Sequence, residues 1–410
     1  MKKYYLVIIF FFLLYKPSFS QGEAALPFLE LQQSPLLLGA GQIGVSIPMS
    51  DPLGFYYNPA QLGYFSRDNN FSMLALPQKT KWFKYFAPDP DLSFNTYGMT
   101  AGYNFKNKYN LPLSIGIGYI HNRVNYGEFV SNNSTFQSYD AFNCYSLGAS
   151  YDYFLLFNLG FSIKSYDSHL SYLTIGENNK PLTVSGTAFD FGTLIIAPIS
   201  NLLFENTKYN LDPNSYIKPK FDLSLGYSIL NLGKKVAYID QAQADPIPRT
   251  ARLGYTFNFG VELFTNQTKL NAFDYSFTAE AEDMLINSDE TGFHGYQGML
   301  GDINFGKQLI ELKGDQNVVV HRGHIFRLFE TVIIASGRYN GHGYNDYKSN
   351  GFGFSSEGIF KLLSSSIENN VIGFVANHFV LEYYRTNNFV DSDFETNFQG
   401  LAFYFKNLSL

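Results

Sequence analysis

The residues that carry out chemistry in enzymes are not arranged in this chain with a recognisable spacing. Ser, His and Asp residues are scattered without a local signature of nucleophilic catalysis. His321 and His324 are three residues apart, so they would share a face on a helix but point in opposite directions on a strand. The single cysteine, Cys144, excludes an intrachain disulfide and a Cys-based zinc site. The sequence therefore predicts no enzyme, no metal site and no cofactor.

The polar residues instead alternate with apolar ones over much of the chain, which is typical of β-strands, whose successive side chains point to opposite faces. In residues 96–105 aromatic and aliphatic side chains occupy the odd positions, and Gly, Thr and Asn occupy the even ones. The same alternation recurs in residues 113–119, 157–164, 221–228, 252–259 and 273–280. Cys144 falls in another such segment, where we expect it to pack on the inner face.

A soluble β-sandwich and a transmembrane β-barrel both show this repeat of two. The exposed face of a soluble sheet should be rich in Lys, Glu and Thr, whereas the polar face here is dominated by Gly, Ser, Asn and Asp. We therefore predict an all-β fold, a transmembrane antiparallel barrel of about 12 to 16 strands with a polar lumen. Later strands are expected at residues 331–339, 351–356, 371–376, 379–384 and 399–407, and long extracellular loops at 200–219 and 285–316.

The composition supports a surface that meets lipid. Aromatic residues make up 18% of the chain, with 41 Phe and 31 Tyr, while only 16% of residues are charged. The formal net charge of −6 argues against a nucleic-acid partner, which should recognise a basic surface. We expect outer-membrane lipid as a partner and no nucleic acid.

The first twenty residues are typical of a secretory leader. Lys2 and Lys3 precede an apolar run that ends near Pro17 and small residues. Cleavage is expected after Ser20; a short transmembrane anchor is the alternative, although the apolar run is shorter than the ~20 residues that span a bilayer. The predicted organisation is a signal peptide at 1–20, an N-terminal plug or lumen segment at 21–65 and an outer-membrane barrel at 66–410, in a Gram-negative type of cell.

Residues 50–63, SDPLGFYYNPAQLG, interrupt the chain between the leader and the strands. Their prolines, glycines and asparagine favour turns, yet the segment is too apolar for a solvated loop. It could be a plug element that gates the lumen or a rigid corner that closes the periplasmic end of the barrel. The residues that would carry either role are Asp51, Tyr57, Asn58, Pro59 and Ala60.

Two further groups of residues have more than one interpretation. The polar residues expected in the lumen could line a polar path or form a hydrogen-bonded interior that stiffens the barrel. The aromatic and basic residues after position 78 could form a partner-binding loop or an anchor at the membrane interface, where Trp and Lys are common. The first group comprises Asp190, Asp222, Arg252, Asp274 and Glu280, and the second Trp82, Phe83, Lys84 and Tyr85.

The N-terminal segment resembles the signature of the PorV/PorQ family of barrels, which is related to the FadL long-chain fatty-acid transporters. The matching residues are the glycines at 39, 41 and 44, Asp51, the run from Tyr57 to Ala60, and Leu62. Shorter similarities follow at residues 229–233, 247–255, 336–339 and 351–354. The approach to the signature departs from the family, because residues 35–38 read PLLL where an Arg- and Ala-rich stretch is usual.

The resemblance implies a fourteen-stranded barrel with one of two roles. PorV-type proteins bind secretion-system proteins or exported cargo in type IX protein secretion and surface attachment. FadL-type proteins pass fatty acids or other hydrophobic small molecules through an opening in the barrel wall. The first role is our expectation for this chain and the second is the alternative.

Overall fold

The computed structural model describes residues 24–76, 80–81, 92–131, 134–175, 178–204, 207–240, 242, 244–265, 268–289, 292–367, 369–392 and 395–407. The expected leader and the segment from Trp82 to Tyr85 lie outside the described residues.

Fourteen of the described strands pair in one antiparallel ring that closes where β1 pairs with both β18 and β3. The prediction of a transmembrane-type antiparallel barrel is thereby confirmed in its fold. The strands of the ring are β1 (Asn69–Ala75), β3 (Leu92–Asn104), β4 (Leu113–Ser131), β5 (Ser134–Asp152), β6 (Leu156–Ile175), β7 (Asn178–Ala197), β9 (Ser215–Gly233), β10 (Thr250–Thr265), β11 (Lys269–Met284), β14 (Val318–Leu328), β15 (Val332–Gly341), β16 (Tyr344–Ser355), β17 (Phe379–Val390) and β18 (Thr396–Lys406).

The alternation in the sequence sorts side chains between the lumen and the outer wall. On β6, for example, Phe157, Leu159 and Phe161 are exposed on the outer wall, whereas Asn158 and Ser162 are buried on the inner face. Cys144 is also buried on the inner face, as predicted. The barrel therefore has an apolar outer wall and a polar interior.

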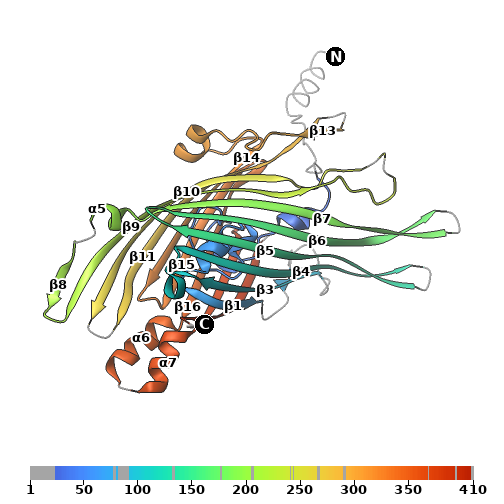
Figure 1. Ribbon diagram of the computed structural model, residues 1–410. Coiled ribbons are helices and arrows are strands. Elements are labelled where there is room, and N and C mark those ends of the chain that lie inside the picture. The colour runs from blue at the N-terminus through green and yellow to red at the C-terminus, as the bar shows by residue number, and fades with distance from the viewer. Residues whose placement is uncertain are drawn as a thin grey trace, which may run out of the picture.

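The two ends of the barrel differ (Figure 1). At the terminal mouth, where β1 begins and β18 ends, lie α5 (Ile199–Leu203), β8 (Tyr209–Asp212) and the hairpin of α6 (Glu357–Ser366) and α7 (Asn370–His378). At the distal end, the β4–β5 and β6–β7 hairpins extend well beyond the other strands.

Two expectations about connections are wrong. Residues 371–376 are not a strand but part of α7, because Asn369 caps a helix by accepting hydrogen bonds from the amides of Val371 and Ile372. The segments 200–219 and 285–316 cannot both be extracellular. The first connects β7 to β9 at the terminal mouth and the second connects β11 to β14 at the distal end.

The distal connection folds back over the outer wall of the barrel. It contains β12 (Ile286–Asp289), β13 (Gly292–Tyr296) and the π-helical turn η4 (Phe305–Ile310). The hydroxyls of Tyr227 and Tyr255 on the wall donate to the carbonyls of Met299 and Leu309, at 2.6 and 3.1 Å. We call residues 297–317 the outer flap; it is the orange segment at the top of Figure 1.

Within the part of the chain that the structure describes, none of the helices combines the length and the apolarity needed to cross a membrane.

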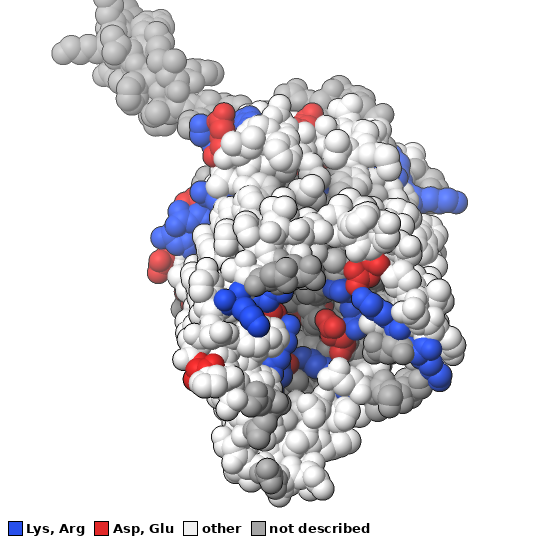
Figure 2. Space-filling view, turned by 60° about the vertical axis from the view of Figure 1, so that its left-hand side comes forward, with Lys and Arg blue, Asp and Glu red and all other residues white. Residues whose placement is uncertain are grey.

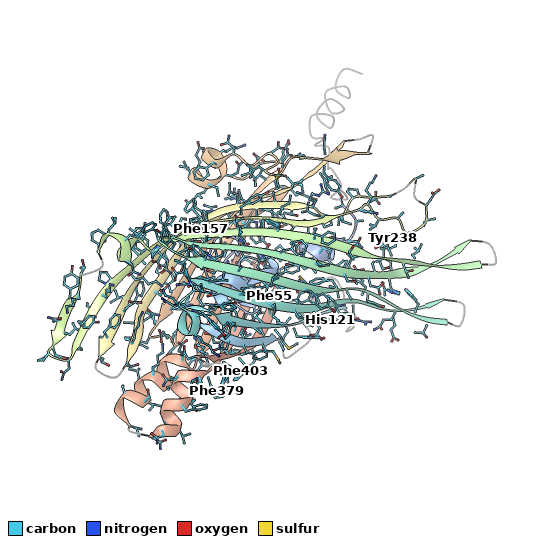
Figure 3. All side chains as sticks on the ribbon, viewed as in Figure 1. Phe55, His121, Phe157, Tyr238, Phe379 and Phe403 are labelled. Atoms are coloured by element: carbon cyan, nitrogen blue, oxygen red, sulfur yellow. The ribbon has the colours of Figure 1, made fainter. Side chains whose placement is uncertain are left out.

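Residues 24–66 lie inside the barrel, where Figure 1 shows them in blue behind the green strands. They form η1 (Pro27–Glu30), α2 (Pro35–Gly39), η2 (Gly54–Tyr56) and α3 (Gln61–Phe65), joined by turns. Nearly every apolar side chain of this plug is buried, including Leu53 and Phe55. Phe55 is labelled at the centre of the barrel in Figure 3. The plug supplies the apolar core that the polar strand faces do not.

Candidate functional site in the barrel lumen

A row of glycines on the inner wall receives one side of the plug. Strand pairing places one glycine from each of β3 to β7 directly opposite the next. A side chain on these residues would collide with the plug: a Cβ on the glycine of β6 would lie 2.1 Å from the carbonyl carbon of Pro59. The row consists of Gly102, Gly116, Gly148, Gly160 and Gly192, and we call it the glycine shelf.

Asn58 fixes the turn that rests on this shelf. Its Nδ2 donates to the carbonyl of Val45 in the plug at 2.8 Å and to that of Thr193 on β7 at 2.9 Å. Its Oδ1 accepts from the amide of Ala60 at 3.0 Å, bridging Pro59, which has no amide hydrogen to give. One side chain thus ties two plug segments to the wall.

Asp51 and Tyr57 hold the lead-in to the same turn. The Tyr57 hydroxyl accepts from the amide of Gln33 at 2.7 Å, and the Asp51 carboxylate accepts from the Ser34 hydroxyl at 2.6 Å and from the amide of Leu53 at 2.7 Å. Burial raises the pKa of Asp51 to about 6, although the hydrogen bonds from Ser34 and Leu53 act in the opposite direction. Asp51 is therefore a buried carboxyl that titrates near neutral pH.

The carboxylate of Glu280 on β11 binds consecutive plug amides. It accepts from the amides of Gly44, Val45 and Ser46 at 2.8 to 3.1 Å, and the Ser46 hydroxyl adds a bond of 3.2 Å. Hydrogen bonds to an ionised acceptor are roughly twice as strong as neutral ones. The plug amides stabilise the buried carboxylate of Glu280, and the carboxylate holds residues 44–46 of the plug in place.

Next to it, Arg252, Glu282 and His321 hold the preceding plug residues. Arg252 donates to the carbonyl of Gln42 at 2.8 Å, and His321 Nδ1 lies 2.9 Å from the carbonyl of Gly41. Glu282 Oε2 joins them, at 2.8 Å from Arg252 Nη2 and 3.1 Å from His321 Nε2. Together with Glu280 these residues form a clasp around the backbone of residues 41–46.

A second buried ion pair lies under the plug. Lys164 Nζ on β6 is 3.1 Å from Asp190 Oδ2 on β7, and both side chains are fully buried. Lys164 also donates to the side chain of Asn231 at 2.9 Å and lies 4.1 Å from the centre of the Tyr56 ring. Because an unpaired charge at this depth would be costly, the two groups depend on each other.

Between the plug and the terminal mouth the lumen opens into a cavity of about 1010 Å³. Figure 2 looks into this hollow and shows charged side chains of both signs around it. On one wall Lys220 Nζ lies 3.6 Å from Asp222 Oδ2 and 3.4 Å from Asp274 Oδ2. On the opposite side Ile325, Ile333 and Tyr404 line the cavity together with the charged residues Arg327 and Glu382.

Among the described residues, the pairing of β18 with β1 ends before β18 does, which leaves a seam between β18 and β3. β1 pairs with residues 401–406 of β18. Beyond Ala75 the described residues pair with β3, through the amide of Leu76, which donates to the Thr96 carbonyl, and through the short strand β2 (Thr80–Lys81), which also lies beside β18. Residues 396–400 of β18 pair only with β17. Phe94 of β3 and Phe398 of β18 meet edge to face across this seam, with ring centres 5.9 Å apart.

A strip of apolar inner-face residues runs from the seam to the cavity. It follows β18 through Phe398, Gly400, Ala402 and Tyr404, with Leu74 of β1 opposite Ala402. Pro35 of α2 covers Gly400, since a Cβ there would lie 3.0 Å from Pro35 Cγ. The strip is therefore closed by the plug on one side and by the Phe94–Phe398 contact at its distal end.

The polar residues predicted for the lumen do face it, but they divide between separate clusters. Arg252 and Glu280 belong to the clasp, Asp190 to the buried pair, and Asp222 and Asp274 to the cavity wall. His321 and His324 point in opposite directions, as expected for a strand: His321 bonds to the plug and His324 to Tyr275.

Sequence reasoning missed Lys164 and the role of His321. Lys164 had a usable signal, because it stands at a polar-face position of an alternating segment, where a buried lysine requires an acidic partner. His321 had none, because its two partners, the carbonyl of Gly41 and the side chain of Glu282, are both distant in sequence. In the described part of the chain, no group of three or more His, Cys, Asp or Glu residues is placed to hold a metal ion.

Comparisons with known proteins find similar barrels only among solved structures. No family model and no curated protein matches the chain. The toluene transporter TodX of Pseudomonas putida is 9% identical, with 92% of this chain and 98% of that chain covered and a TM-score of 0.41. The monoaromatic hydrocarbon channel CymD is 12% identical (91% and 97% covered, TM-score 0.37), and a Pseudomonas aeruginosa FadL homologue is 8% identical (91% and 97%, TM-score 0.36). The chain is thus similar over most of its length to these three solved barrels, at identities that do not assign it to a family.

Proposed function

We propose that this chain is an outer-membrane barrel that passes small hydrophobic molecules between the membrane or the cell exterior and the periplasm. The observation that carries the proposal is the seam beside β18 and the apolar strip behind it. An axial route would have to displace a plug held by the clasp, the buried ion pair and the glycine shelf. A lateral route would instead part Phe94 from Phe398 beside β2 and displace α2 at Gly400.

In this mechanism the solute enters at the seam and moves along Gly400 and Ala402. The small size of these two residues leaves room once Pro35 shifts. The solute then reaches the cavity at Tyr404 and Ile333 and leaves through the terminal mouth. The charged lining of the cavity disfavours retention of an apolar solute, so release into a periplasmic acceptor follows.

The test compares uptake of a labelled long-chain fatty acid and of toluene by cells that carry or lack the protein. Phe398→Ala should raise uptake, because it removes one half of the aromatic contact that closes the seam. Leu401→Ala is the matched control, since Leu401 lies on the outer face of the same strand and is 44% exposed. Equal uptake with and without the protein, unchanged by Phe398→Ala, would overturn the proposal.

A second candidate function is that of a PorV/PorQ-like component of type IX secretion or surface attachment, acting through protein partners. The outer flap favours it, because Met299, Leu300, Phe305 and Ile310 are 47–68% exposed on a connection at the distal end. Exposed apolar groups of this kind often mark protein contacts. A mild-detergent purification that recovers secretion-system or cargo proteins with the wild type, and loses them with Phe305→Asp and Ile310→Asp, would support this role over transport.

A further inference from the structure

The α6–α7 hairpin at the terminal mouth presents an apolar surface that no other described element covers. Its described residues include only two ionisable carboxylate or ammonium groups, Glu357 and Lys361. Both turn toward the barrel: Glu357 lies 2.9 Å from Lys406 and Lys361 lies 2.5 Å from Glu330. Six apolar residues of the outward face are 39–70% exposed, namely Ile359, Leu362, Leu363, Ile367, Val371 and Phe374, and the exposed polar residues beside them, Ser366, Asn369, Asn370 and Asn377, are uncharged.

This surface is continuous with the apolar outer wall of the barrel. The Phe374 ring lies 5.8 Å from that of Phe379 at the start of β17, and Phe379 lies 4.8 Å from Phe405 and 5.7 Å from Phe403 on β18. Figure 3 labels Phe379 and Phe403 one above the other, where the barrel meets the hairpin. Bands of aromatic residues at the edge of an outer-membrane barrel lie at the membrane interface.

The hairpin is also fixed in position relative to that band. Besides the two ion pairs, His378 Nδ1 lies 2.8 Å from the carbonyl of Lys406, and Asn407 donates to the carbonyl of Asn377 at 2.9 Å. In Figure 2 the lobe below the mouth, at the height of α6 and α7 in Figure 1, is almost entirely white apart from the residues drawn in grey. A tethered, uncharged surface at this height suits lipid rather than water.

We propose that the α6–α7 hairpin is a membrane-surface anchor, seated in the phospholipid leaflet at the terminal mouth with Leu362, Val371 and Phe374 among the acyl chains. Amphipathic helices bind such interfaces through their apolar faces. A charged protein partner would find no complementary group on the described outward face. The proposal does not depend on whether the barrel transports solutes or binds proteins.

The experiment places a tryptophan on the hairpin and asks whether lipid reaches it. The full-length protein with the only Trp replaced, Trp82→Phe, is reconstituted into bilayers of phosphatidylcholine with brominated acyl chains. Phe374→Trp in this background should lose fluorescence to the same extent as Phe403→Trp, which reports the barrel wall. Tyr64→Trp, which lines the lumenal cavity, is the control that should not be quenched.

A Phe374→Trp signal that brominated lipid leaves unchanged and that aqueous iodide quenches would overturn the anchor. The same result with iodide quenching abolished by an added periplasmic extract would point to a protein partner and would equally overturn it. As a second measurement, Leu362→Asp should make the hairpin more sensitive to protease in bilayers but not in detergent. Equal sensitivity in both would contradict a lipid contact.

Discussion

Glu280 shows how a single side chain can determine the state of the lumen. Its carboxylate accepts from the amides of residues 44–46, which an apolar side chain would leave without acceptors, and burial strengthens each of these bonds. Glu280 is therefore a residue of β11 whose side chain makes its hydrogen bonds to the plug.

Glu280→Gln should therefore loosen the plug. The neutral amide keeps one acceptor but turns a donor toward the plug amides, so we expect a loss of roughly 1.5–3 kcal/mol in the free energy of unfolding. The measurement is urea unfolding in lipid vesicles, followed by intrinsic fluorescence. Glu262→Gln is the matched control: its carboxylate pairs with the half-exposed Lys269 and should cost less than about 1 kcal/mol. Equal losses in the two variants would contradict the clasp.

Asp51 should make the stability of the folded protein fall as the pH rises. Its pKa is raised from 3.8 to about 6 in the folded state, so the folded protein binds more protons than the unfolded one between these values. The free energy of unfolding therefore falls as the pH rises from about 4 to 6, and above that range Asp51 causes no further change. Asp51→Asn should remove this slope, which is seen by melting both proteins at a series of pH values. Parallel curves would show that Asp51 does not titrate there.

At the scale of elements, the glycine shelf depends on the register of five strands. Gly160→Ala places a methyl group against the backbone of Pro59, which cannot move without the whole turn, and overpacking of this kind costs roughly 1–3 kcal/mol. Gly260→Ala, on a strand position whose nearest atom would be 3.0 Å away and which does not touch the plug, is the control. The melting temperature of the first variant should fall clearly below that of the second.

The α6–α7 hairpin should loosen in acid. Burial tends to raise the pKa of Glu357, but Lys406 and Lys361 outweigh it and hold that pKa at about 2. The resulting stabilisation is present above the ordinary pKa of 4.5 and is lost as the pH falls toward 2. Glu357→Gln should reproduce the acid state at neutral pH, with faster proteolysis within α6 and α7. Ser364→Ala, which leaves both ion pairs of Glu357 in place, is the control and should not change the rate of proteolysis.

For the whole molecule, we expect the terminal mouth to face the periplasm and the distal end to face the exterior, the usual orientation of barrels whose longer connections are extracellular. With Cys144→Ser as background, Met299→Cys on the outer flap should react with a membrane-impermeant maleimide in intact cells. Leu203→Cys on α5 should react only after the outer membrane is opened, although both positions are more than 60% exposed. Labelling of both in intact cells would contradict this orientation.

The sequence by itself determined the strands and their two faces, because the repeat of two is a local property written into residues such as Phe157 and Asn158. It also located the N-terminal segment ahead of the barrel strands, since Pro59 and its neighbours are incompatible with a strand. The failure at residues 371–376 has the same local origin: an apolar run that short is compatible with strand or helix, and only the cap at Asn369 and the position beyond the barrel edge decide it.

Only the tertiary structure decided which residues form a site. Gly116 and Gly160 become one shelf through strand register, which depends on pairing between distant segments. Glu280 and Gly44 are 236 positions apart, and their contact exists because the barrel closes around the plug. The seam is likewise invisible in the sequence, since it depends on where the described pairing of β1 with β18 ends, at Ala75 opposite Leu401. Local alternation decides which face of the barrel wall a side chain occupies, whereas closure of the ring decides which residues it contacts.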